Sequence, residues 1–200
     1  MQPPGHVVLF AGRNDAFEHL NRQGMARVAA QPEGKRQVFH ADDDPIHPGH
    51  RHQGIDIFGG NQPGLVPVYA ASDGYLTRQV DWKSSLIIRV PEDPLQPDRQ
   101  IWIYYTHLAD QNGRSYITAE FPPGTTEKFI EAGQVLGYQG NYSGDPQNPV
   151  GVHLHFSIVK DDGQGKFLNE LNIQNTLDPS PYLGLILNSH NASLELPVCH

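Results

Sequence analysis

The stretch "PVGVHLHFSI", residues 149–158, places two histidines one residue apart within an apolar run. Every second position from Val152 to Ile158 is apolar, a pattern typical of a half-buried β-strand. Residues two apart on a strand point to the same face and lie about 6.6–6.8 Å apart along it. His153 and His155 therefore share one face. They could bind one metal together, or one could be a ligand and the other a catalytic group.

Composition limits what the rest of the chain can be. Two hundred residues fit one domain with a real core, and 20 glycines with 17 prolines indicate a protein rich in strands and loops. A net charge of −8 without a basic stripe disfavours nucleic-acid binding. No apolar run approaches the ~18–20 residues of a transmembrane span. The single Cys199 excludes an intrachain disulfide and a zinc site of several thiolates.

Strand patterns dominate from about residue 52, and turn residues separate them. The "SDG" at 72–74 predicts a tight hairpin between the first two strands. Long connections at 109–128 and 140–151 are expected to wall a groove. The pattern predicts a mainly β fold, a twisted, largely antiparallel sheet folded toward a sandwich or half-barrel. The expected strands cover residues 66–70, 74–80, 85–90, 100–108, 134–139 and 153–159.

The first fifty residues differ from the rest. An Asp15-x-x-Glu18 capping box predicts a helix over about 15–30, although Gly24 weakens it. The amino terminus lacks the charged and apolar regions of a signal peptide, so the protein stays inside or the sequence is a mature form. We expect an N-terminal accessory segment at 1–47, a main domain at 48–183 and a C-terminal tail at 184–200.

The stretch "RHQGIDIFGG", residues 51–60, offers the partners that the histidine pair needs. His52 and Asp56 would be about 13 Å apart on a straight strand, too far to share a metal. Gly54 can adopt backbone angles that bend the chain between them. His47 and His50 lie nearby, but His52 has the better spacing and adjoins Gly54.

One histidine of "HLH" added to His52 and Asp56 makes two nitrogens and one carboxylate oxygen. This set suits a tetrahedral Zn²⁺ with a fourth position open to water, as in catalytic zinc sites. Zinc lowers the pKa of water to ~7 and polarises carbonyl groups. Either the remaining histidine of "HLH" or His107, at the end of "IWIYYTH", could then transfer protons.

His52-x-x-x-Asp56, "YYTHL" at 104–108 and "HLHF" at 153–156 occur in an order that resembles the lysostaphin- or LytM-type zinc peptidases. These are endopeptidases that cut peptide cross-links in bacterial cell walls. "VPVYAASDGYL", "EAGQVLGYQGNYSG" and "LDPSPYL" also resemble family segments, and the resemblance covers about residues 48–183. The insertion "PEDPLQPDRQ" and the first fifty residues depart from it.

The resemblance implies a zinc-dependent peptidoglycan endopeptidase with a fold of the duplicated hybrid motif type. His52, Asp56 and His155 become the ligands of one Zn²⁺. His107 and His153 become the catalytic pair that orients or deprotonates water and stabilises the oxyanion. The substrate would be a peptidoglycan peptide, which implies a place in the cell envelope or outside the cell.

Several alternatives stay open at this point. In some latent relatives an upstream Asn fills the fourth zinc position, and Asn14 or Asn21 could do so here. A wall-binding or regulatory domain could keep zinc and hydrolyse nothing. A D,D-carboxypeptidase needs a downstream Glu near the last His, and "HLHFSIVK" has no acidic residue before Asp161. The bond cleaved and the oligomeric state are not set by the sequence.

Overall fold

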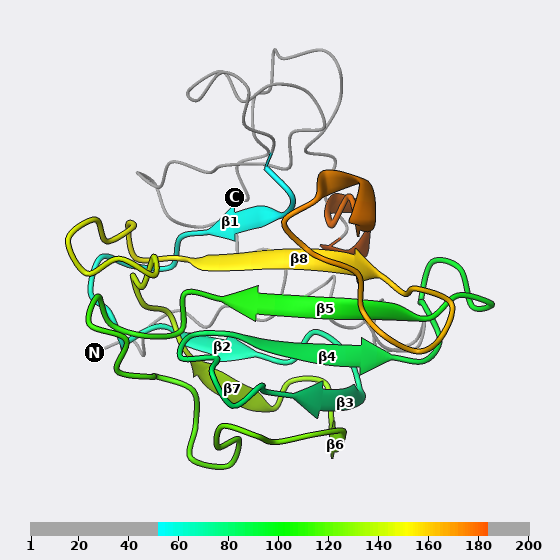
Figure 1. Ribbon diagram of the computed structural model, residues 1–200, viewed down its shortest axis with the longest axis horizontal. Helices are drawn as coiled ribbons and strands as arrows, with labels where there is room; N and C mark the ends of the chain where they lie inside the picture. Colours follow the sequence, from blue (N-terminus) through cyan, green and yellow to red (C-terminus); the bar gives the residue numbers. More distant parts are fainter. Residues whose placement is uncertain (1–51, 184–200) are drawn as a thin grey trace, which may run out of the picture.

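The computed structural model of the protein describes residues 52–183, and these residues are mainly β, as the sequence predicts (Figure 1). The predicted helix over 15–30, the accessory segment and the tail lie outside the described residues. No helix within 52–183 has the length and apolar character needed to cross a membrane. The strands are β1 (Ile55–Ile57), β2 (Pro67–Tyr69), β3 (Gly74–Thr77), β4 (Leu86–Val90), β5 (Ile101–Thr106), β6 (Lys128–Ile130), β7 (Val135–Tyr138), β8 (Leu154–Lys160) and β9 (Thr176–Leu177), with short 3₁₀ helices η1 (Ile173–Asn175) and η2 (Ser180–Leu183).

The strands form two antiparallel sheets. The larger sheet has the order β1-β8-β5-β4-β3-β6, and β9 pairs with β8 off this path. The smaller sheet pairs β2 with β7 and lies behind β4 in the view of Figure 1. In the larger sheet β8 lies between β1 and β5, and His155 pairs with Asp56 on one side and with Thr106 on the other. This register brings three distant parts of the sequence together at one histidine.

The tight hairpin predicted at "SDG" is wrong. β2 pairs with β7, whereas β3 pairs with β4 and β6, so the turn connects two sheets instead of two neighbouring strands. Ala70 and Ala71 are buried where the chain crosses between the sheets. The Ala71 N–H donates a hydrogen bond to the hydroxyl oxygen of Tyr105 at 2.8 Å. At Gly74, a Cβ atom would lie 2.5 Å from the carbonyl oxygen of Arg89. Glycine is needed at position 74 because β3 and β4 pack closely there.

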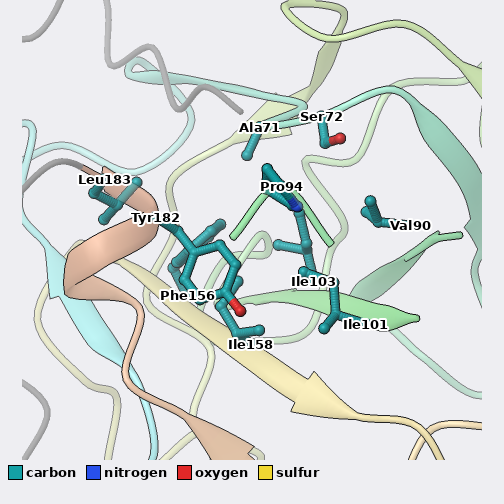
Figure 2. Close-up of a pocket in the computed structure, with 10 residues that line it drawn as sticks. All are labelled: Ala71, Ser72, Val90, Pro94, Ile101, Ile103, Phe156, Ile158, Tyr182 and Leu183. Carbon is teal, nitrogen blue, oxygen red and sulfur yellow. The ribbon is translucent and has the colours of Figure 1, made fainter. Parts of the chain in front are cut away.

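One hydrophobic core spans both sheets. It contains Val68 of β2, Leu136 of β7 and, from β8, the alternate residues Leu154, Phe156 and Ile158. Figure 2 shows a pocket within this core, into which Phe156 and Ile158 point. Its lining is almost wholly apolar, so the pocket is a packing feature of the core. It is lined by Ala71, Ser72, Val90, Pro94, Ile101, Ile103, Phe156, Ile158, Tyr182 and Leu183.

The sequence predicts a half-buried strand at this position, but β8 is buried on both faces, so the prediction of half-burial is wrong. The face opposite the core carries His155, Ser157 and Val159, all buried. Val159 packs with Ile87 and Trp102 in a second small cluster, which Phe167 and Leu168 cover. The segment after β8 crosses the front of β8 and β5 in Figure 1 (orange). A polar strand face thus becomes enclosed because a later loop folds over it.

Candidate metal centre

The three residues expected as ligands converge on one point. His52 Nε2 lies 3.1 Å from Asp56 Oδ1 and 3.1 Å from His155 Nδ1, and the last two atoms are 2.9 Å apart. All three residues are buried and form a group able to hold a metal ion. Ligand atoms around a tetrahedral Zn²⁺, at bond lengths of 2.0–2.1 Å, are about 3.3 Å from one another. The donor set and its spacing therefore fit zinc.

Backbone register explains this convergence. Asp56 and His155 face each other across the β1–β8 pair, and the chain bends at Gly54 to return His52 to them. Gly54 does not have a left-handed φ. A Cβ at this position would lie 2.4 Å from the Phe156 carbonyl oxygen and 2.7 Å from Ser157 Oγ. Glycine is needed at position 54 because the bend passes directly over β8, where a side chain would clash. The reason is therefore steric, and not the backbone freedom inferred from the sequence.

The other two histidines lie beside the three donors. The rings of His107 and His153 have centroids 4.5 Å apart, and His153 Nε2 is 3.5 Å from Asp56 Oδ1. The His153 ring stacks on Phe58 at 5.0 Å. His107 follows the end of β5 with a φ of 69°, a left-handed conformation uncommon for residues other than glycine. All five residues expected at the site thus occupy one place in the fold.

Backbone carbonyls orient both of these rings. His107 Nδ1 lies 2.7 Å from the Tyr142 carbonyl oxygen, and His153 Nδ1 lies 2.6 Å from that of Gly151. Because a carbonyl oxygen only accepts, each Nδ1 must carry the hydrogen and donate it. The neutral rings then present Nε2 with a free lone pair. The loop 140–151, expected as a groove wall, supplies both carbonyl groups.

Burial sets the charge state of this pair. It lowers the pKa of His107 to about 4, with repulsion from His153 acting in the same direction. Burial also lowers the pKa of His153, against the attraction of Asp56. Near neutral pH both rings are therefore uncharged, the state in which a histidine can accept a proton.

Asp56 and His155, two of the residues expected as ligands, have the opposite electrostatic pattern. Burial would raise the pKa of Asp56, but hydrogen bonds with His155 and His52 hold it far below its usual range. Burial would lower the pKa of His155, but hydrogen bonds to Asp56 and Glu170 raise it to about 9. The site thus keeps an ionised carboxylate in a buried place and favours a positive charge beside it.

Sequence reasoning missed three contacts. Phe58 stacks on His153, and Ser157 and Glu170 hydrogen-bond His155 from behind the donor atoms. Ser157 follows His155 by two residues, so strand periodicity could have placed it on the same face. Glu170 lies in the loop after β8, and no local pattern connects it with a histidine fifteen residues earlier.

Comparison with known proteins gives matches among solved structures alone: no family model and no curated protein matches this chain. The catalytic domain of lysostaphin from Staphylococcus simulans is 19% identical, with a TM-score of 0.48, over 75% of this chain and 92% of that one. The catalytic domain of the prophage-encoded M23 protein EnpA from Enterococcus faecalis, as a point mutant, is 21% identical, with a TM-score of 0.42, over 72% of this chain and 96% of that one.

A putative glycyl-glycine endopeptidase LytM from Ruminococcus gnavus is 22% identical, with a TM-score of 0.45, over 86% of this chain and 73% of that one. Lysostaphin in its longer form is matched over 49% of its length. At such identities and TM-scores, the residues of the site must carry the assignment of function.

Proposed function

We propose that this chain is a zinc-dependent metalloendopeptidase that hydrolyses peptide cross-links of bacterial peptidoglycan, with residues 48–183 as its peptidase domain. The observation that carries the proposal is the convergence of His52, Asp56 and His155 beside two neutral histidines, the partly buried His107 and the buried His153. A structural zinc site needs four protein ligands and no proton-transfer groups, whereas three ligands leave a position for chemistry. The peptidoglycan substrate rests on the resemblance of the ordered motifs, and a place in the cell envelope or outside the cell follows from that substrate.

The metal would be held by His52 Nε2, Asp56 Oδ1 and His155 Nδ1. When bound there, Zn²⁺ supplies a Lewis acid that lowers the pKa of water and polarises the substrate carbonyl. The protein contributes the proton transfers. The Nε2 lone pair of His153 accepts a proton as water attacks the peptide carbonyl, and the resulting imidazolium donates it to the leaving amine nitrogen.

Neighbouring groups assist these steps. Asp56 Oδ1, 3.5 Å from His153 Nε2, stabilises the imidazolium while it carries the proton. The carbonyl groups of Tyr142 and Gly151 keep the rings of His107 and His153 from turning. His107 lies close enough to His153 to share in proton transfer or to stabilise the charge that develops on the carbonyl oxygen.

The test is release of new amino termini from purified peptidoglycan. We expect release with intact glycan chains, its loss with a chelator and its return with added Zn²⁺. Asp56→Ala should abolish release, whereas Asp98→Ala, which removes an exposed carboxylate elsewhere, should not change it. Mass spectrometry of the fragments would name the bond. Stoichiometric zinc without any release, also after removal of residues 1–47, would favour a non-catalytic wall-binding or regulatory domain.

A further inference from the structure

A second layer of hydrogen bonds lies behind the metal-facing side of His155. We infer that Glu170, together with Ser157, is the residue pair that positions His155 for metal binding. The inference rests on the proposed function, because it takes the three converging donors to be zinc ligands. It adds to that function a carboxylate from a loop that none of the sequence motifs contains.

The two nitrogens of the His155 ring face opposite surroundings. Nδ1 points to the donor cluster, 2.9 Å from Asp56 Oδ1. Nε2 lies 2.8 Å from Ser157 Oγ and 3.1 Å from Glu170 Oε1. The Ser157 hydroxyl donates its own hydrogen to Glu170 Oε1 at 3.1 Å. Ring nitrogen, hydroxyl and carboxylate thus form a closed triangle.

Donor and acceptor roles within this triangle decide the tautomer. An ionised carboxylate only accepts hydrogen bonds, and the Ser157 hydrogen is already directed at it. The hydrogen between the ring and the two oxygens must therefore come from His155 Nε2. The neutral ring then has its lone pair on Nδ1, the atom that faces His52 and Asp56. This tautomer is the one a metal ligand requires, and such outer hydrogen bonds typically fix it in metal sites.

The charges around His155 also support a positioning role for Glu170. The Glu170 side chain is 13% exposed and its ion-pair partner in the structure is His155, a residue that is neutral when it binds metal. Asp56, which is buried, adds a second carboxylate on the other side of the same ring. A buried carboxylate and a largely enclosed one around neutral ligands are costly unless a positive charge lies between them. A divalent cation at the three donors balances both.

The backbone near Glu170 is held independently of its side chain. Gln53, the residue after His52, donates from Nε2 to the Leu171 carbonyl oxygen at 2.9 Å. Asn169 Oδ1 accepts from the Leu171 N–H at 3.0 Å, and Leu168 N–H donates to the Lys160 carbonyl oxygen at 3.0 Å. Substituting Glu170 therefore removes the carboxylate while these bonds keep the loop over β8.

The experiment measures the zinc dissociation constant of the full chain by competition with a chelator of known affinity. Loss of an outer hydrogen-bond partner typically weakens metal binding about 10–100-fold, and we expect this for Glu170→Ala. Glu170→Gln keeps an acceptor oxygen in place without the charge, so it should recover part of the affinity. Ser157→Ala should have the smallest effect. Glu120→Ala is the matched control, since it removes an exposed carboxylate paired with Lys128 at 3.0 Å.

A second readout separates positioning from general stability. In the zinc-loaded wild type, the His155 Nε2 proton should give a slowly exchanging imidazole resonance in NMR spectra, and in Glu170→Ala it should exchange rapidly with water. Thermal unfolding of the metal-free variants shows whether the fold is kept. Wild-type affinity and slow exchange in Glu170→Ala would overturn the inference alone. A wild type that binds no zinc would overturn the proposed function and this inference with it.

Discussion

The two faces of β8 offer a comparison within one strand. On one face Leu154, Phe156 and Ile158 join the core between the sheets, and on the other His155 and Ser157 form the candidate site. Both faces are buried to nearly the same degree. They differ in how burial is satisfied, because apolar side chains need only packing, whereas each buried ring nitrogen needs a polar partner. The core face should therefore control stability, and the site face should control metal binding and chemistry.

The largest effect is expected from His155→Ala on the site face. This change removes one of three donor atoms and leaves the core face untouched, so zinc binding should be abolished and hydrolysis should fall to background. Elemental analysis of the purified variant checks the metal, and circular dichroism checks the fold. A variant that still holds one zinc per chain would contradict the ligand role of His155.

His153→Ala should separate chemistry from metal binding. Its ring lies beside the donors, with Nε2 3.5 Å from Asp56 Oδ1, but outside the set of three. We expect one zinc per chain and a decrease in kcat of about 10²–10⁴-fold, the range for loss of a general acid or base. Steady-state kinetics on peptidoglycan fragments with parallel zinc analysis is the measurement. If this variant lost the metal while His155→Ala kept it, the roles of the two histidines would be reversed.

Phe156→Ala should act on the core face. Phe156 is 1% exposed and packs edge-on against Tyr105 with ring centroids 5.4 Å apart. The expected loss is about 3–5 kcal/mol in the free energy of unfolding, measured by chemical denaturation. Below the unfolding transition, zinc should remain bound.

Phe129→Ala is the control for this variant, because Phe129 is 55% exposed and its removal should change the free energy of unfolding by about 0.5 kcal/mol or less. If Phe156→Ala removed zinc without lowering stability, the two faces of β8 would not be separable, and the comparison would fail.

Local patterns in the sequence were enough to predict most strands. Strands β2, β3, β4, β5, β7 and β8 all lie within or close to the ranges predicted from alternation and turn residues, because these patterns depend on neighbours along the chain. The short strands β1, β6 and β9 were not predicted as strands. They have two or three residues each, too few for a periodic pattern.

Partners across the sheet are another matter. The "SDG" turn predicts a hairpin because turn chemistry is local, yet the strands on either side of it pair with other strands. Which strand lies beside which depends on how apolar faces are buried against each other in three dimensions. The turn residues alone do not determine which strands pair.

The candidate site divides in the same way. The sequence by itself determined the fold class, and its spacing offered His52, Asp56 and the two histidines of "HLH" as candidates, because same-face spacing and ligand chemistry can be read along the chain. The division of His52, Asp56 and His155 as ligands from His107 and His153 as the catalytic pair came from the resemblance of the ordered motifs. Only the tertiary structure decided which atoms of these residues meet, that Gly54 must pass over β8, and that Glu170 reaches His155. The physical reason is that strand register and loop closure depend on contacts between segments about a hundred residues apart in the sequence. The pattern within one short stretch of sequence contains no information about those contacts.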